Sequence, residues 1–236
     1  MTSVVVSQPM FLPWIGMLEQ MRLADVYVHY DDVAYSRGGF QNRVQVKTQA
    51  GIGWLTLPVQ HDLGQRIRDV RLGADASFPR KHLATLRQAY ARAPHRDAML
   101  AVAEKVYATT SPFLLDWTVA GLEALWEVFE VRPKTVLFAS ELGVPGEGSE
   151  RVLSLAQRLG ATRYVTGRGA LAYLDHRGFE ERGIEVCYVR YATQPWPQLH
   201  GPFTPFVTAL DLLANAGPAG RACIVSETIH WKELAA

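Results

Sequence analysis

Cysteine is scarce in this sequence, the charges nearly balance, and long apolar runs are missing. The two cysteines, Cys187 and Cys223, are too few and too far apart for a zinc site or a disulfide framework. A formal net charge of +1 gives no bulk attraction to nucleic acid or to an anionic membrane. No stretch approaches the roughly 18 uninterrupted apolar residues of a membrane span, and the apolar run at residues 4–6 is too short for a signal peptide. We therefore expect a protein of the reducing cytoplasm that neither crosses a membrane nor binds nucleic acid.

The composition is that of an ordinary globular protein. Of the 236 residues, 48% are hydrophobic and 20% are charged, so the chain has enough apolar material for a substantial core. We predict one domain over residues 1–236. The stretch 142–149 is rich in glycine and proline, which makes it the best candidate for a seam between two lobes.

The start of the chain predicts a strand, a helix and a second strand. Residues 4–7 are short and β-branched, which is typical of a buried strand. Pro9 and Pro13 end this strand because proline cannot continue a hydrogen-bonded ladder. Apolar residues then recur at helical spacing over residues 14–24, and residues 26–30 predict the second strand.

The rest of the chain predicts a hairpin, a helical segment and an alternation of strands and helices. The hairpin covers residues 43–59 with its turn at 48–53, and a further short strand is expected at 67–72. Three helices are expected next, at 77–91, at 96–107 and from 111 onward. The alternating elements are strands at 134–139, 163–166 and 184–190 and helices at 149–160 and 204–215. This order predicts an α/β fold, with a mainly parallel sheet, flanking helices, an inserted β-hairpin and a helical segment.

Several short blocks match one family when they are taken in order. They are SQPMFLPWIG at 7–16, DDV at 31–33, NR at 42–43, WLTLPV at 54–59, KH at 81–82 with Tyr90 and Ala93-Pro94, YVTG at 164–167 with Tyr173-Leu174, and WPQLHG at 196–201 with LDLL at 210–213. Each block alone is weak, but together they cover nearly the whole chain, and the sequence resembles the WbqC-like protein family.

The resemblance implies a role in glycan or antibiotic biosynthesis. A related type of protein joins a carrier-protein thioester to an amino sugar through an amide bond, so the resemblance implies an acyl carrier protein as a partner. Met10 stands between Pro9 and Phe11 in the opening block, so no thiol or hydroxyl group is present there. A nucleophile at that position is therefore not available to this chain.

Polar residues follow the first two predicted strands. Gln8 is a candidate for orienting a ligand carbonyl or hydroxyl, because ligands bind at the carboxyl ends of strands in open α/β sheets; capping of loop backbone is the alternative. Asp31 and Asp32 end the second strand, and adjacent residues of an extended chain point to opposite faces, so at most one of them faces such a site. That carboxylate is a candidate general base or amine-binding group. Mg²⁺ binding and a purely structural turn are the alternatives.

Asn42 and Arg43 begin the predicted hairpin and are candidate substrate-binding residues. The five N–H donors of arginine suit a phosphate, such as that of a nucleotide or of the phosphopantetheine on a carrier protein. A surface salt bridge is the alternative interpretation.

Two histidines are candidate catalytic bases. His82 lies beside Lys81 in the first turn of a predicted helix, where the helix dipole favours a neutral imidazole and Lys81 is placed to bind an anion. His200 lies in a loop, where a hydrogen bond to a nearby carbonyl is the alternative. The remaining predicted substrate-binding residues are Trp14, as the wall of an apolar pocket, Tyr173 and Gln198.

The leading hypothesis is an acyl- or aminoacyltransferase that passes an acyl group from a thioester to an amine. His82 or His200 would deprotonate the amine, Asp31 or Asp32 would orient it, and Gln8 or backbone N–H groups would stabilise the oxyanion. No cofactor is required apart from the phosphopantetheine of a partner carrier protein. The hypothesis needs the segments around Gln8, Asp31, His82 and His200 to share one cleft.

Two other functions stay open. The strand–loop–helix opening loosely resembles nucleotidyl- or sugar-nucleotide-handling enzymes, although PWIG at 13–16 replaces the paired histidines typical of that loop. A non-catalytic protein that binds a carrier protein is the other, and a basic recess near Arg37, Arg43 and Lys47 would suit an acidic carrier.

Overall fold

The apolar start of the chain forms the central strand β1 (Ser3–Ser7) of a six-stranded sheet. The computed structural model describes residues 1–192 and 194–234. Val5 is buried in one hydrophobic core, whereas Val4 and Val6 are buried in a second core on the other face of the sheet. Because both faces are covered, the strand is apolar without alternation, as parallel strands in layered α/β folds are.

The sheet has the strand order β10-β9-β8-β1-β2-β7, and only β10 is antiparallel to its neighbour. In addition to β1, the sheet contains β2 (Val26–His29), β7 (Thr135–Phe138), β8 (Arg163–Thr166), β9 (Glu185–Arg190) and β10 (Glu227–His230). The prediction of a mainly parallel sheet is confirmed. The edge strand β10 was not predicted.

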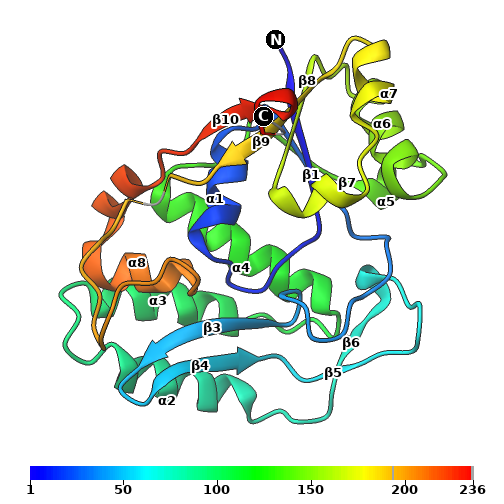
Figure 1. The fold of residues 1–236 in the computed structure, drawn as a ribbon. Coiled ribbons are helices and arrows are strands. Elements are labelled where there is room, and N and C mark those ends of the chain that lie inside the picture. Colours follow the sequence, from blue (N-terminus) through cyan, green and yellow to red (C-terminus); the bar gives the residue numbers. More distant parts are fainter. Residues whose placement is uncertain (193, 235–236) are drawn as a thin grey trace.

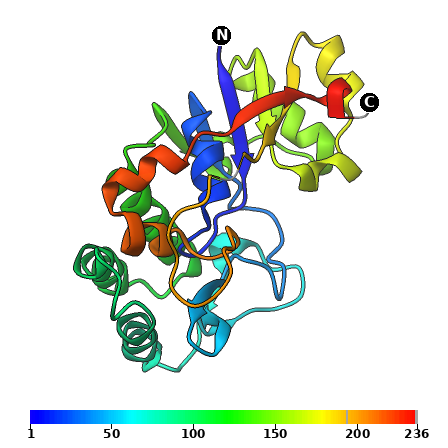
Figure 2. The same ribbon diagram turned by 60° about the vertical axis from the view of Figure 1, so that its left-hand side comes forward.

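Helices cover both faces of this sheet (Figures 1 and 2). The helices α1 (Ile15–Arg22) and α4 (Leu114–Phe129) share the core of Val5, through residues such as Met17 and Leu122. The helices α6 (Gly148–Arg158) and α7 (His176–Glu181) share the other core, through residues such as Val152 and Phe179. The short helix α5 (Ala139–Leu142) follows β7 directly.

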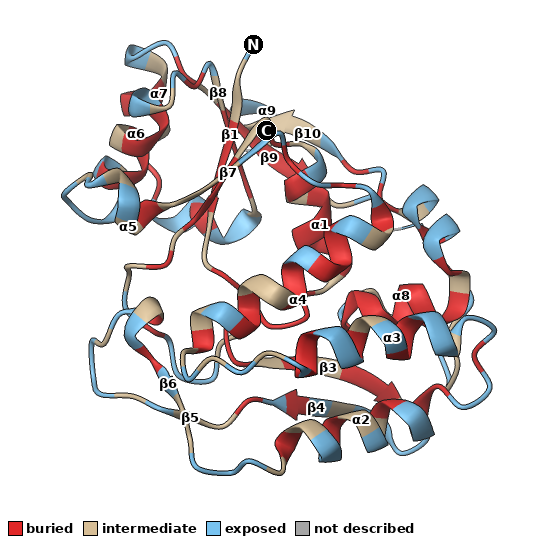
Figure 3. Ribbon diagram, turned by 180° about the vertical axis from the view of Figure 1, so that it is seen from behind, coloured by how far each residue is buried: buried red, intermediate tan, exposed pale blue. Residues whose placement is uncertain are grey.

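A second layer lies on the far side of α4 from the sheet (Figure 1). It contains a hairpin of β3 (Arg43–Thr48) and β4 (Gly51–Thr56), a ribbon of β5 (Val59–Gln60) and β6 (Arg71–Leu72), and the helices α2 (Phe78–Ala89), α3 (Arg96–Tyr107) and α8 (Ala209–Ala216). In Figure 3, α2, α3 and α4 each show a buried stripe toward the interior and exposed residues outside. The predicted inserted hairpin and helical segment are therefore both present. The other short elements are η1 (Ile67–Asp69), η2 (Arg168–Ala172), η3 (Pro218–Cys223) and α9 (Trp231–Leu234).

Several predicted boundaries differ from those in the structure. The hairpin turn is tighter than expected, because β4 already begins at Gly51. Residues 67–69 form a 3-10 turn, so only Arg71–Leu72 pair as a strand there. The helix expected from residue 149 begins at Gly148, and the Ser149 hydroxyl accepts a hydrogen bond from the Asp175 N–H at 2.7 Å instead of capping its own helix.

The helix predicted at residues 204–215 is α8, which begins five residues later than predicted, at Ala209. The reason is a contact between segments far apart in the sequence. The Thr208 N–H donates to the Gln45 carbonyl of the hairpin at 2.9 Å, and Thr208 forms a β-bridge with Trp14, so this residue is not yet helical. The Thr208 hydroxyl then caps the helix by accepting from the Leu210 N–H at 3.3 Å.

The loop after β1 is pressed against α4. Leu12 is fully buried and adopts φ 41°, in the left-handed region that few side chains occupy. A Cβ atom on Gly121 of α4 would lie 3.2 Å from the Leu12 nitrogen, so glycine permits this close approach. None of the described helices is both long enough and apolar enough to cross a membrane.

Candidate functional site

The carboxyl ends of β1, β2 and β8 open onto a cavity of about 1050 Å³, which we call the sheet-edge cavity. Gln8 follows β1, Asp32 follows β2, and Gly167 follows β8. The chain leaves β1 toward β2 on one side, while β8 leads to β9 on the other, so the connections diverge between β1 and β8. Open parallel sheets bind ligands at such a switch point.

A buried ion pair forms one wall of the sheet-edge cavity. Asp32 Oδ2 accepts a hydrogen bond from an Nη atom of Arg151 at 2.6 Å, and the two side chains are only 12% and 9% exposed. Arg151 Nε donates to the Val144 carbonyl at 3.0 Å, and its guanidinium lies 5.1 Å from the centroid of the Tyr30 ring. The hydrogen bond to Asp32 raises the pKa of Arg151, against the effect of burial. Arg151 is itself held by the Val144 carbonyl and the Tyr30 ring, and it therefore holds the Asp32 carboxylate in place.

The second oxygen of Asp32 has no such partner. Oδ1 is buried and accepts no hydrogen bond from the described residues. A buried carboxylate oxygen without a donor is costly in a folded protein. Asp32 also lines the cavity, so its carboxylate lies beside the space that a ligand N–H or O–H group would occupy.

The amide of Gln8 is oriented by a second glutamine. Gln8 Oε1 accepts a hydrogen bond from Gln41 Nε2 at 2.7 Å, and Gln41 Oε1 in turn accepts from the Ser36 N–H at 3.0 Å. Gln41 is buried, with 3% of its surface exposed. In these two hydrogen bonds the side-chain oxygens of Gln8 and Gln41 act as acceptors. The NH₂ group of Gln8 is therefore placed to donate to a ligand oxygen.

Two tyrosines add further donors to the cavity. Burial raises the pKa of both Tyr30 and Tyr173, with Arg151 opposing the rise at Tyr30. Both phenols therefore keep their protons at neutral pH. Tyr173 is also half exposed and lies on the rim.

The loop after β8 brings backbone close to the cavity at Gly167 and Gly169. A Cβ atom on Gly167 would lie 3.1 Å from Tyr191 Oη and 3.4 Å from Gln20 Nε2, whereas one on Gly169 would meet nothing within 4 Å. Gln20 Nε2 donates to Tyr191 Oη at 3.0 Å beneath this loop. Gly167 is therefore closely packed against these side chains, and Gly169 is not.

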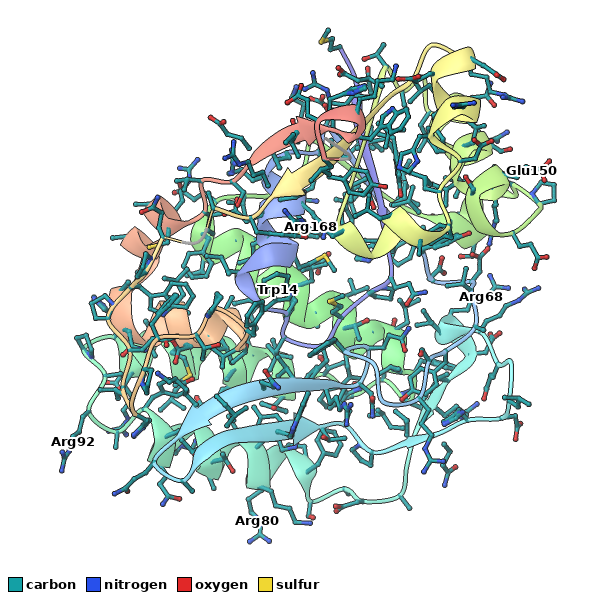
Figure 4. The ribbon with its side chains drawn as sticks, viewed as in Figure 1. Trp14, Arg68, Arg80, Arg92, Glu150 and Arg168 are labelled. Atoms are coloured by element: carbon teal, nitrogen blue, oxygen red, sulfur yellow. The ribbon has the colours of Figure 1, made fainter. Side chains whose placement is uncertain are left out.

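A smaller apolar pocket of about 280 Å³ adjoins the sheet-edge cavity, and Met10 lines both. Trp14 and Phe206 form part of its wall, with ring centroids 5.6 Å apart. Figure 4 shows Trp14 at the start of α1, where its ring covers Gly16; a Cβ there would lie 2.2 Å from the ring. Trp14 thus has the predicted position in an apolar wall.

His82 lies outside the sheet-edge cavity and is held by its neighbours. Its Nε2 accepts a hydrogen bond from the Thr56 N–H at 3.2 Å, which leaves the Nδ1–H to donate to Tyr107 Oη at 2.9 Å. Burial lowers the pKa of His82 to about 4. Both ring nitrogens are occupied by protein partners, so the geometry gives His82 a structural place between α2 and β4.

His200, Asp31 and Lys81 also lie away from the cavity lining. His200 Nε2 contacts the Ala89 carbonyl at 2.6 Å, as the alternative interpretation expected. Asp31 is buried and accepts from the N–H and hydroxyl of Ser140, so it caps α5. Lys81 pairs with the exposed Asp75 at 3.0 Å.

The other predicted substrate-binding residues lie in the second layer. Asn42 is buried and donates to the Leu57 carbonyl at 2.9 Å. Arg43 stacks on Trp54 beside a separate recess. Gln198 belongs to a buried network, where Nε2 donates to Asp211 at 2.8 Å.

The expectation that Gln8, Asp31, His82 and His200 share one cleft is wrong. Of these four only Gln8 lines the sheet-edge cavity, where the structure brings it together with Asp32 and Tyr173. The two histidines are held in the second layer by bonds to Tyr107 and to backbone, which the sequence pattern did not reveal.

Sequence reasoning missed Arg151, Tyr30 and Gln41. Tyr30 precedes the acidic pair directly, so its place at a strand end was a usable signal. The sequence contains no such signal for Arg151 and Gln41, because their partners in the site, Asp32 and Gln8, lie far away along the chain. The glycine-rich stretch 142–149 was interpreted as a seam, and its residues 143–148 line the cavity.

Comparison with known proteins agrees with the motif blocks. The model of the WbqC-like protein family matches residues 8–223. A protein of Mycobacterium tuberculosis (strain ATCC 25618 / H37Rv), named "Uncharacterized protein Rv1507c", is 30% identical over 224 residues, which cover 92% of this chain and 95% of the relative. No solved structure gives a significant match. On the extent of these matches, the chain belongs to the WbqC-like protein family.

Proposed function

We propose that this protein is an acyltransferase that forms an amide bond, passing an acyl group from a carrier-protein thioester to an amine such as that of an amino sugar, in glycan or antibiotic biosynthesis. The single observation that carries the proposal is the Asp32 carboxylate at a polar cavity, with Oδ2 held by Arg151 and a buried Oδ1 that has no donor among the described residues. An amine presents the N–H groups that this oxygen lacks. Arg151 holds the other oxygen, so the carboxylate cannot turn away.

The proposed step balances without a cofactor. The amine nitrogen attacks the thioester carbonyl carbon, a C–N bond forms, and the C–S bond breaks. Asp32 takes a proton from the amine, and the proton leaves with the thiol. Asp32 thus takes the role of base that sequence reasoning gave to His82 or His200.

The neighbouring groups suit the two ends of such a reaction. The Gln8 NH₂ group is a candidate donor to the oxyanion that forms on the carbonyl oxygen, and such donors usually contribute most in acyl transfer. The apolar pocket around Trp14 and Phe206 would hold the hydrocarbon part of the acyl group. Met10 lines both spaces and would lie near the reacting carbonyl.

Direct transfer is favoured over a covalent enzyme intermediate. Among the described residues that line the sheet-edge cavity there is no cysteine and no histidine. Ser7 and Thr166 supply hydroxyl groups there without the adjacent imidazole that activates such a nucleophile.

The test uses acyl thioesters of N-acetylcysteamine and of a carrier protein, with a panel of amino sugars. Thiol release and the mass of the amide product are followed together. Asp32→Asn should lower kcat/KM by about 100-fold or more, the contribution expected of a general base. Gln8→Ala should lower kcat more than it changes KM.

Two controls separate chemistry from folding. Asp97→Asn removes a carboxylate whose side chain is 95% exposed on α3, and it should leave the rate unchanged. His200→Gln should also retain most activity. Amide formation that depends on His200 and survives Asp32→Asn would reject the role of Asp32, and carrier binding with no turnover on any amine would favour a non-catalytic partner.

A nucleotide- or sugar-nucleotide-handling enzyme is the second candidate. It is favoured by the glycine-rich segments 143–148 and 167–169, which meet at the switch point of the sheet. It predicts product formation that requires a nucleoside triphosphate and Mg²⁺. Product formation without either one rejects it.

A further inference from the structure

A second recess, of about 830 Å³, lies beside the β3–β4 hairpin and the β5–β6 ribbon. We call it the hairpin recess. Its lining comes from residues 35, 37–38, 42–43, 56–62, 65 and 71. The proposed acyl transfer makes no use of it.

The hairpin recess concentrates positive charge. Arg37, Arg43 and Arg71 line it against one carboxylate, that of Asp62, so the lining carries a net charge of +2 (three arginines minus one aspartate). The whole chain carries only +1. Among the described residues, none of the three guanidinium groups forms an ion pair.

Two of the three arginines lie over aromatic rings. The guanidinium carbon of Arg43 lies 4.4 Å from the Trp54 ring centroid, and that of Arg71 lies 5.0 Å from the Phe113 centroid. Arg43 also donates to the Gly38 carbonyl, while its Nε is buried with no partner among the described residues. The guanidinium groups of Arg43 and Arg71 thus lie beside ring faces, where a cation–π contact favours their position.

The Tyr35 hydroxyl lies within reach of this charge. Burial raises its pKa, and the nearby charges of Arg43 and Arg37 oppose the rise. The His61 ring packs on Tyr35, with centroids 4.6 Å apart. A phenolic side chain and two guanidinium groups therefore line the same recess.

A thin wall separates the hairpin recess from the sheet-edge cavity. The Tyr35 N–H donates to the Gln65 carbonyl at 2.8 Å, and the Ile67 N–H donates to the Val33 carbonyl at 2.9 Å. Val33 and Arg66 line the sheet-edge cavity, whereas Tyr35 and Gln65 line the hairpin recess. The two spaces are neighbours with different linings.

We propose that the hairpin recess is a second ligand site, which binds a phosphorylated small molecule through Arg37, Arg43 and Arg71. A phosphate monoester or diphosphate carries the two or more negative charges that match a lining of +2. The planar fork of arginine fits phosphate oxygens in pairs, and the volume leaves room for an organic group. This site does not depend on the chemistry at Asp32.

Calorimetric titration of the full chain with inorganic pyrophosphate, and separately with ADP, tests the proposal. Arg37→Gln and Arg71→Gln should each weaken binding about tenfold, because each removes a charge-assisted hydrogen bond. Arg43→Lys keeps the charge but loses the planar fork and the guanidinium contact with the Trp54 ring, so it should weaken binding as well. Raising the salt concentration should weaken binding by the wild type.

The matched controls are Arg80→Gln and Arg92→Gln. Both arginines are exposed and project away from the body of the molecule (Figure 4). These two control variants should leave the affinity for pyrophosphate unchanged. Arg37 forms no side-chain hydrogen bond with the described residues, so Arg37→Gln should fold normally, and the melting temperature checks this.

Three outcomes would overturn the proposal. One is a wild-type protein that binds neither pyrophosphate nor ADP at millimolar concentration. Another is binding that is unchanged in Arg37→Gln and Arg71→Gln, or equally weakened in the two controls. The third is binding of an acidic carrier protein at these arginines with no affinity for small phosphates, which would reassign the recess to a protein partner.

Discussion

The indole N–H of Trp196 donates to the Asp211 carboxylate over 2.7 Å, inside the second layer of the molecule. The same Oδ1 accepts from Gln198 Nε2 at 2.8 Å, and Oδ2 accepts from Tyr90 Oη at 3.0 Å. Asp211 has no exposed surface. This satisfied network ties α2 and the loop at 196–198 to α8.

Asp211→Asn should therefore destabilise the fold strongly. An amide keeps one oxygen to accept from Trp196 and Gln198, but its NH₂ group cannot accept the Tyr90 hydroxyl proton. We expect the free energy of unfolding to fall by about 3 kcal/mol, measured by urea denaturation. Asp97→Asn is the surface control and should change it by no more than about 0.5 kcal/mol. Equal stability of the two variants would contradict the role of Asp211.

Stability should fall as the pH drops from about 6.5 toward 4. Burial lowers the pKa of both His82 and His29 to about 4, while a histidine in the unfolded chain titrates near 6.5. Between these values the unfolded state binds more protons, so stability is full above the unfolded pKa and is lost toward the folded one. Each histidine contributes up to about 3 kcal/mol of this loss.

Paired variants measure the contribution of His82. Urea denaturation at several pH values should give a shallower pH dependence for His82→Gln than for the wild type. Tyr107→Phe removes the acceptor of the Nδ1–H but keeps the imidazole, so it should lower stability at neutral pH and keep the pH dependence. An unchanged slope in His82→Gln would refute the assignment.

The elements predicted most accurately are those whose bounds are determined by residues close together in the sequence. The helix at 96–107 and the strand at 163–166 have the predicted bounds, because apolar spacing and short-range turn residues determine them. The sequence also predicted that at most one of Asp31 and Asp32 faces the site. Asp32 alone lines the cavity, but β2 ends at His29 and both residues lie in a turn, so strand alternation is not the reason.

Contacts between distant segments could not be predicted from one sequence. Asp32 and Arg151 are 119 residues apart, and no local pattern links them. His82 was chosen for its residue type and helix position, but Tyr107 and the Thr56 backbone decide its role. In both cases the partner comes from tertiary packing, which overrides the local signal.

The two glycines after β8 should respond differently to alanine. A Cβ on Gly167 would crowd the hydrogen bond between Gln20 and Tyr191, whereas a Cβ on Gly169 enters open space. Gly167→Ala should lower the free energy of unfolding by about 1 kcal/mol through overpacking, and Gly169→Ala should leave it nearly unchanged. Urea denaturation of both variants checks this, and an equal effect would mean that the loop relaxes freely.

The Asp32–Arg151 pair should show strong energetic coupling. Arg151→Met leaves a buried carboxylate without its cation, so the free energy of unfolding should fall by about 3 kcal/mol. Adding Asp32→Asn removes the uncompensated charge, so the double variant should be more stable than Arg151→Met alone.

Urea denaturation of the wild type, the two single variants and the double variant forms a thermodynamic cycle. We expect a coupling energy of at least about 1 kcal/mol, as is found for residues in direct contact. Strictly additive effects would mean that the ion pair does not stabilise the carboxylate. Arg151 would then be free to serve a ligand, and the fixed position of Asp32, on which its proposed role as base depends, would be lost.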